Sequence, residues 1–188
     1  MKLSDHFTLK ELTKSHTAER KGIDNTCNDA QLSCLKSLCR EILEPVRIHY
    51  GIPFAPSSGF RCLALNREIG SSDTSQHTLG QAADFELPGV SNMDLAQWIV
   101  ANLDYDQLIL EFYDGVDPHS GWVHCSYVEN RNRKKALRFD GKVFEPISTR
   151  EGMRRPGTQL SIAALIPGTC SRLSIEKQSS SCTVTMGK

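Results

Sequence analysis

Residues 75–84 constrain this chain more than any other segment, because they place an imidazole and a carboxylate seven positions apart (84 − 77 = 7). Gly80 and two alanines lie between His77 and Asp84, and such small residues allow close approach of other backbone segments. A second imidazole, His124, follows later in an apolar run. Two imidazoles and one carboxylate suit zinc, and a site with three protein ligands keeps a fourth position open for water or substrate. The sequence therefore predicts a metal site of the open, catalytic kind.

A histidine and an aspartate this close in sequence most often belong to a solvated polar loop. Such a loop has no need of the small residues between His77 and Asp84. In addition, Asp84-Phe85-Glu86-Leu87 alternates polar and apolar side chains, as the beginning of a strand does. The combination favours the metal site over the solvated loop.

The pattern Ser-x-His-x-x-Gly-x-Ala-x-Asp at residues 75–84, followed by Trp-Val-His at residues 122–124, resembles the signature of the zinc D-alanyl-D-alanine carboxypeptidases. That group includes D-Ala-D-Ala dipeptidases and the L-alanyl-D-glutamate endopeptidases of phage lysins, all of which cut peptidoglycan stem peptides. Ser58-Gly59-Phe60-Arg61 resembles the Ser-Gly-Tyr-Arg segment of the family, and residues 6–12 resemble the opening of its phage-encoded branch. The resemblance covers about residues 3–147. It implies a zinc peptidase that holds one Zn²⁺ per chain on His77, Asp84 and His124.

The same resemblance implies two roles at the substrate. The arginine of the family's Ser-Gly-Tyr-Arg segment stabilises the oxyanion formed by attack on the carbonyl, which gives that role to Arg61, and a guanidinium suits it because it offers paired donors. Ser75 matches a serine that helps to hold the substrate. Two plainer interpretations stay open, in which Arg61 is a surface arginine that opens a helix and Ser75 is an ordinary loop serine.

The general base is the point at which the sequence departs from the family. The carboxypeptidase and dipeptidase branches place Glu or Asp three positions before the final histidine, where this chain has Gly121. Either the base has moved or activity has been lost. Glu111 is the favoured base, because a carboxylate that ends the apolar run Leu108-Ile109-Leu110 is otherwise badly placed. His119 is the rival base or a substrate contact, although a turn around Pro118 explains it without any function.

A predicted hairpin supports Glu111. If residues 114–121 form the connecting loop, Tyr113 lies opposite Trp122, and two residues further along each strand Glu111 lies opposite His124. Directly opposed residues share one face of the sheet. This register would bring Glu111 within reach of the metal site.

Apolar periodicity and turn residues predict the order of the elements. Thr8 and Glu11 form a capping box for a short helix, and a long core helix runs from about residue 28 until Gly51, with a kink at Pro45. Further elements are expected as an edge strand at 52–58, a short helix at 62–69, a helix capped by Ser91 or Asn92, strands at 105–113 and 122–127, and a two-residue hairpin turn at Asp140-Gly141.

These elements indicate an α+β fold, a small antiparallel sheet flanked by helices. Residues 1–150 are expected to form a single zinc-peptidase domain, and residues 151–188 a C-terminal extension that is partly disordered. The expected substrate is the peptidoglycan stem peptide, cut at either D-Ala-D-Ala or L-Ala-D-Glu. Two alternatives remain, a metal-free module that binds cell-wall peptide on the same fold and a different zinc enzyme of this architecture.

Composition limits the partners. Lys plus Arg equals Asp plus Glu over the 188 residues, so no general attraction to nucleic acid or to a membrane is expected, although residues 131–135 form a local basic patch.

The seven cysteines are odd in number and show no Cys-x-x-Cys, which is typical of a chain folded in a reducing cytoplasm. The first residues lack the apolar core of a signal peptide. We therefore expect a monomer made in the cytoplasm, which acts at the cell wall only if something else, such as a phage or prophage system, delivers it.

Overall fold

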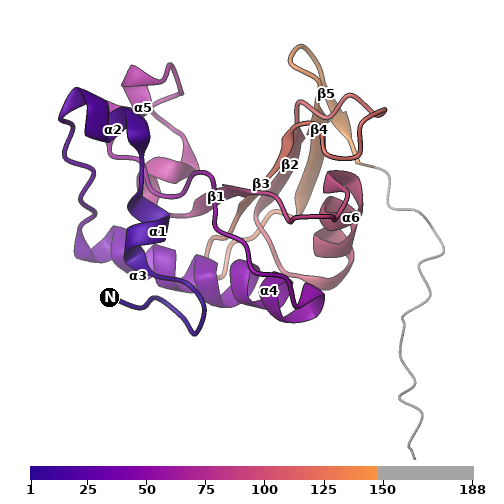
Figure 1. Ribbon diagram of the computed structural model, residues 1–188, viewed down its shortest axis with the longest axis horizontal. Coiled ribbons are helices and arrows are strands. Elements are labelled where there is room, and N and C mark those ends of the chain that lie inside the picture. The colour runs from indigo at the N-terminus through magenta and orange to yellow at the C-terminus, as the bar shows by residue number, and fades with distance from the viewer. Residues whose placement is uncertain (148–188) are drawn as a thin grey trace, which may run out of the picture. The chain divides into compact units, whose positions relative to one another are not determined.

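The computed structural model describes residues 1–147, in which helices lie against one face of a five-stranded sheet (Figure 1). The α+β class is thereby confirmed. The predicted extension at residues 151–188 and the exact end of the domain lie outside the described residues. The helical elements are α1 (Leu9–Thr13), α2 (His16–Lys21), α3 (Asp29–Leu38), the π-helical turn η1 (Cys39–Leu43), α4 (Glu44–Tyr50), α5 (Leu63–Glu68), the 3₁₀ turn η2 (Gln76–Leu79) and α6 (Asn92–Asn102). The strands are β1 (Ala82–Phe85), β2 (Gln107–Glu111), β3 (Trp122–Ser126), β4 (Lys135–Phe139) and β5 (Phe144–Pro146).

The predicted helix caps are confirmed. Thr8 and Glu11 form a capping box at α1, Ser91 caps α6, and Gly51 ends α4 with a left-handed backbone. The long core helix is one helical run made of α3, η1 and α4, and it contains a π turn just before Pro45. Because proline has no N–H to donate and its ring crowds the preceding turn, the irregularity falls there.

The sheet has the order β1-β3-β2-β4-β5 and is mixed, which corrects the expectation of a purely antiparallel sheet. The pairs β1–β3, β2–β3 and β4–β5 are antiparallel, whereas β2 and β4 run parallel. Asp106 explains the parallel pair, since its carboxylate accepts the backbone N–H of Arg133 at 3.0 Å and its carbonyl accepts that of Lys135 at 3.0 Å. These bonds hold the beginning of β4 beside the beginning of β2.

Two local expectations are changed by the structure. The prediction of an edge strand at residues 52–58 was wrong, because only Ser58 of this segment forms a bridge, to Asp84. Two prolines in the segment cannot donate to a ladder. The hairpin at Asp140 is confirmed, but its loop spans residues 140–143, since the first pair is Phe139 with Phe144.

Alternation along the strands separates the core from the opposite face of the sheet. The core face packs against α3, η1, α4 and α6 and carries Ala83, Phe85, Leu108, Leu110, Val123 and Cys125. The opposite face carries Asp84, Ile109, Glu111, Trp122 and His124, which line a cleft of about 720 Å³. We call it the metal cleft. No helix within residues 1–147 has the length and apolar character needed to cross a bilayer.

Candidate metal centre

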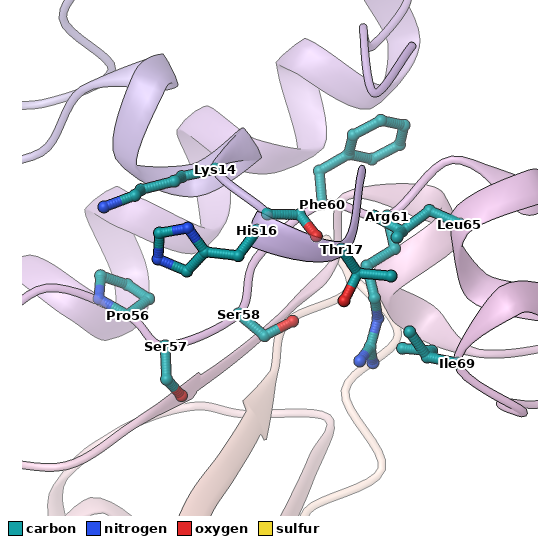
Figure 2. A pocket seen from close by; sticks show the side chains of 11 residues that line it. Lys14, His16, Thr17, Pro56, Ser57, Ser58, Phe60, Arg61, Leu65 and Ile69 are labelled. Carbon is teal, nitrogen blue, oxygen red and sulfur yellow. The ribbon is translucent and has the colours of Figure 1, made fainter. Parts of the chain in front are cut away.

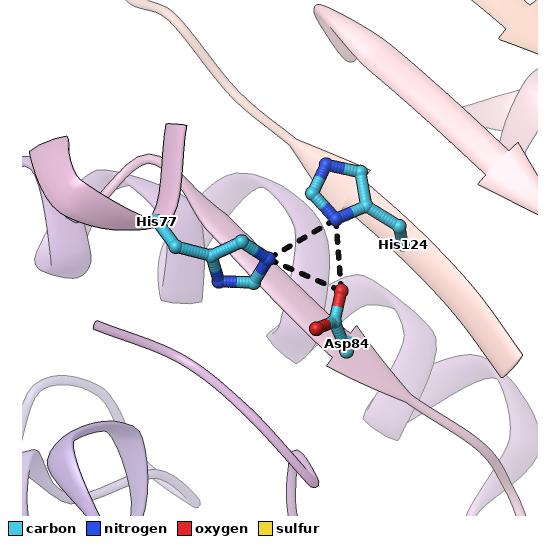
Figure 3. Close-up of side chains that lie close together, drawn as sticks. All are labelled: His77, Asp84 and His124. Atoms are coloured by element: carbon cyan, nitrogen blue, oxygen red, sulfur yellow. Dashed lines mark hydrogen bonds and ion pairs between the residues drawn. The ribbon is translucent and has the colours of Figure 1, made fainter. Parts of the chain in front are cut away.

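Asp84 and His124 are brought together by strand pairing. They are directly opposed residues of the antiparallel pair β1–β3, on the face that lines the metal cleft. His77 comes from η2, the turn that leads into β1, and its ring points at the other two side chains (Figure 3). All three residues are buried. The structure therefore gathers the three predicted ligands from two strands and one short turn.

The three candidate ligand atoms form a tight triangle. His124 Nδ1 lies 2.8 Å from Asp84 Oδ1, and His77 Nε2 lies 3.2 Å from both Asp84 Oδ1 and His124 Nδ1. Atoms that bind one tetrahedral zinc ion at about 2.0–2.2 Å are about 3.3–3.6 Å apart. The observed edges are only slightly shorter, so the donor set and its spacing fit zinc.

The hydrogen bond on the far side of the His77 ring prepares it as a ligand. Its Nδ1 lies 2.6 Å from the carbonyl oxygen of Gly59, which can only accept, so Nδ1 carries the proton and Nε2 keeps its lone pair. Burial lowers the pKa of His77, which favours the neutral ring. Gly59 can occupy this position because it has no side chain, since a Cβ there would lie 2.3 Å from the carbonyl oxygen of Leu12.

Asp84 is held in its charged form. Burial opposes ionisation of this carboxyl, but hydrogen bonds with His124 and His77 outweigh burial and hold its pKa far below the ordinary value. A buried carboxylate that faces two imidazoles supplies the negative charge that a divalent cation needs.

Glu111 reaches the metal cleft, although by a different register from the one predicted. Ile109, and not Glu111, lies opposite His124, and Glu111 lies opposite Trp122. The shift is two residues, so Glu111 stays on the face of His124. It is half-buried, and burial together with the charge of Asp84 raises its pKa, against the opposing effects of His124 and Arg61.

Backbone geometry explains the shift. Phe112 leaves β2 with a φ of 55°, and its N–H is donated to Phe139 of β4 at 2.6 Å. Gly121 has a φ of 67°, and a Cβ on it would lie 1.8 Å from the carbonyl oxygen of Glu111. The loop therefore begins at residue 112, and Tyr113 cannot pair with Trp122.

Arg61 and Ser75 also line the metal cleft. The backbone N–H of Arg61 is donated to the carbonyl of His77 at 3.2 Å, which ties the arginine to the ligand turn. Its Nε is buried and has no hydrogen-bond partner among residues 1–147. Burial lowers the pKa of its guanidinium, while the charges of Asp84 and Glu111 act in the opposite direction.

The structure does not bring His119 to this cleft. His119 is exposed in the loop between β2 and β3 and lines a separate hollow with Pro88 and Asn92. This placement favours Glu111 over His119 as the base.

Two features of the metal cleft were not predicted from the sequence. The buried indole N–H of Trp122 makes no full hydrogen bond within residues 1–147, although it lies close enough to Glu111 to favour the charged form of that carboxylate. At another part of the cleft, Arg133 and Gln76 both donate to buried Asp106, at 2.6–2.9 Å. Trp122 lies inside the Trp-Val-His motif, which is the one sequence signal that pointed to it.

The fold and the site define a class of protein, an α+β domain in which residues 1–147 hold one His-Asp-His cluster suited to a metal, in a cleft. A family model described as Peptidase M15 matches residues 5–126, and the chain belongs to this family of zinc-dependent metallopeptidases. A search of curated proteins gives no match.

Proposed function

We propose that this chain is a zinc-dependent peptidase that hydrolyses stem-peptide bonds of peptidoglycan, at D-Ala-D-Ala or at L-Ala-D-Glu. The observation that supports it most is the convergence of the His77, Asp84 and His124 triangle with Glu111 and Arg61 in one cleft. Membership of the M15 family supports the zinc peptidase chemistry. Action on this substrate would place the chain at the cell wall.

The metal would be held by His77 Nε2, Asp84 Oδ1 and His124 Nδ1, as one Zn²⁺ per chain. Zinc bound in this way acts as a Lewis acid toward a carbonyl and brings the pKa of water close to neutrality. Three protein ligands leave room for a substrate group, which a purely structural zinc site does not. All three ligand residues line the same cleft as Glu111.

Glu111 would be the general base and then the general acid. Burial raises the pKa of Glu111, and a base whose pKa is closer to the working pH returns its proton more readily. In this role Glu111 takes a proton from the attacking water and passes it to the nitrogen of the leaving amine.

Arg61 and Ser75 would position the substrate. The guanidinium of Arg61 is half-buried, and its Nε has no hydrogen-bond partner within residues 1–147, so it can donate to the oxygen on which negative charge develops. Ser75 is the N-cap residue of η2, two positions before the ligand His77, and it lines the same cleft.

Digestion of purified peptidoglycan tests the proposal. The purified chain is loaded with zinc, incubated with murein sacculi, and the soluble products are identified by mass spectrometry. Loss of a terminal D-Ala would identify a carboxypeptidase. Products that end in a free L-Ala would identify an endopeptidase. Binding to sacculi without metal and without products would instead support the metal-free binding module.

A further inference from the structure

The indole of Trp122 brings a buried donor to the metal cleft. Its Nε1 makes no full hydrogen bond within residues 1–147. A buried N–H without an acceptor destabilises a folded chain, so native proteins contain few of them. Among the described residues, the acidic side chains that line the metal cleft are those of Asp84 and Glu111. These two carboxylates are therefore the charged acceptors to compare.

Strand pairing assigns Trp122 to Glu111 and not to Asp84. In the pair β2–β3, Trp122 lies directly opposite Glu111. Directly opposed residues share a face of the sheet and have Cβ atoms about 4.5–5.5 Å apart. Asp84 lies opposite His124 on the other side of β3, and its Oδ1 is already 2.8 Å from His124 Nδ1. Glu111 is therefore the neighbouring acceptor.

The carboxylate of Glu111 has no ion pair within residues 1–147. Arg61 acts on it through its charge alone. The side chain of Arg61 also lines a second hollow, together with Thr17 and Ile69 (Figure 2). The indole of Trp122, in contrast, acts on Glu111 as a hydrogen-bond donor. A donor without another acceptor thus lies across one strand pair from a carboxylate that no cation holds.

Aromatic rings support the indole. The ring of Phe112 lies 5.1 Å from that of Trp122, and the ring of Phe139 lies 5.5 Å from that of Phe112. Phe112 has a left-handed backbone, with a φ of 55°, which is uncommon for a residue other than glycine. Its N–H is donated to the carbonyl of Phe139. The backbone conformation that ends β2 therefore also places a ring against the indole.

An indole N–H is well suited to hold a base in place. It has one donor, no acceptor and no charge, so it does not compete for the proton that the base takes up. When it donates to one oxygen of a carboxylate, the other oxygen stays free to accept from water or substrate. A lysine or arginine in the same place would lower the basicity of the carboxylate through its charge.

We propose that Trp122 is a positioning residue, whose indole N–H donates to the carboxylate of Glu111 and holds that carboxylate in place for proton transfer in the metal cleft. This inference rests on the proposed function, in which Glu111 is the general base. Trp122 acts through Glu111 and needs no contact with the substrate.

NMR tests the hydrogen bond without catalysis. The chain contains two tryptophans, Trp98 and Trp122, so the nitrogen–proton spectrum of the zinc-loaded chain has two indole N–H signals, which Trp98→Phe assigns. Glu111→Gln exchanges a charged acceptor for a neutral one, so the proton signal of Trp122 should move upfield while that of Trp98 stays. Glu129→Gln alters an exposed carboxylate and should move neither signal. An unmoved Trp122 signal in Glu111→Gln would overturn the proposal.

Kinetics tests whether the bond serves the base. Trp122→Phe keeps an aromatic ring but has no N–H, so kcat on a stem peptide that the chain cleaves should fall roughly 10- to 100-fold, as a misplaced catalytic group predicts. KM and zinc content should stay unchanged. Trp98→Phe is the matched control on α6, where the indole stacks on His49 at 4.2 Å outside the metal cleft, and it should keep kcat.

A double variant separates positioning from packing. If Trp122 acts through Glu111, adding Trp122→Phe to Glu111→Gln should cause no further loss of kcat. Long incubations followed by mass spectrometry measure these low rates. A loss by the same factor with and without Glu111 would mean that Trp122 only packs, and the proposal would be wrong.

Failure of the proposed function is distinguishable from failure of this inference. If the unaltered zinc-loaded chain cleaves no stem peptide, the function fails, and the NMR comparison alone decides whether Trp122 is bonded to Glu111. If the chain is active but Trp122→Phe keeps its kcat, the function stands and the positioning role of Trp122 is excluded.

Discussion

Single atoms decide whether the site holds metal. Each of His77, Asp84 and His124 contributes one atom to a triangle with edges of 2.8–3.2 Å, and an open site has few other ligands to compensate for a loss. We expect His77→Ala, Asp84→Ala and His124→Ala each to lose most of their bound zinc, as measured by atomic absorption on the purified proteins. His119→Ala, which removes an imidazole outside the metal cleft, should keep its zinc. Full zinc content in the three ligand variants would exclude the triangle as the metal site.

We expect the carboxylate of Glu111 to be required for turnover but not for binding of the metal. Glu111→Gln keeps the shape of the side chain but cannot accept a proton, so turnover on murein should fall roughly 10²–10⁴-fold with zinc content unchanged. His119→Ala should retain most of its activity, because His119 lies in a different hollow. An inactive His119 variant beside an active Glu111 variant would reverse the assignment of the base.

At the scale of elements, the sequence could predict which segments form strands and which face each residue occupies. Alternation in residues 107–111 and 122–126 is a property of the strands themselves, so Glu111 and His124 were placed correctly on one face. The register between the strands depends on where the loop begins. That point is set by the left-handed backbone of Phe112 and by its bond to Phe139, a residue of a strand that comes later in the chain. The alternation of residues within the two strands gives no information on the backbone conformation of Phe112 or on its bond to Phe139.

Gly121 should be needed to keep this register. A Cβ at Gly121 would lie 1.8 Å from the carbonyl oxygen of Glu111 and 2.7 Å from the carbonyl carbon of Phe112, and both are backbone atoms that cannot turn aside. Gly121→Ala should therefore lower the free energy of unfolding by more than about 2 kcal/mol and lower activity with it. Gly89→Ala is the matched control, since Gly89 has a φ of 75° but nothing within 4 Å of an added Cβ.

The two glycine variants separate two costs. Gly89→Ala should show only the conformational cost of a left-handed backbone, about 1–2 kcal/mol. Urea unfolding measures both variants against the unaltered chain. Equal destabilisation of the two would mean that the contact with Glu111 is relieved by a small movement and does not fix the register.

At the scale of the whole molecule, the cluster of candidate metal ligands was easier to predict than the path of the chain. The candidates lie in two short motifs, so residue type and spacing sufficed to select His77, Asp84 and His124, which the structure brings together. The parallel pairing of β2 with β4 depends on bonds between Asp106 and the loop before β4, and a sequence that reads as two hairpins gives no sign of them. Trp122 likewise has no predicted role within its motif, because only the folded chain shows that it lines the cleft and lies close to Glu111.

The N-terminal segment is attached to the core helix by one carboxylate, Glu44, and this attachment should depend on pH. Burial of Glu44 raises its pKa, but hydrogen bonds from the ring and backbone of His6, at 2.8 and 2.7 Å, outweigh burial and hold the pKa below its ordinary value of 4.5. A group whose pKa is lower in the folded chain stabilises it above the unfolded pKa, and that stabilisation is lost as the pH falls through the folded pKa.

Glu44→Gln should therefore unfold at lower urea concentration than the unaltered chain at pH 7, by about 1 kcal/mol, because the charged acceptor of two hydrogen bonds becomes a neutral amide. The difference should shrink as the pH is lowered from 4.5 toward 3, where the carboxyl of the unaltered chain is progressively protonated. Glu129→Gln, which alters an exposed carboxylate, should show no such difference at any pH. If the difference for Glu44→Gln persists undiminished at pH 3, Glu44 acts by the shape of its side chain, and its charge does not hold the N-terminal segment in place.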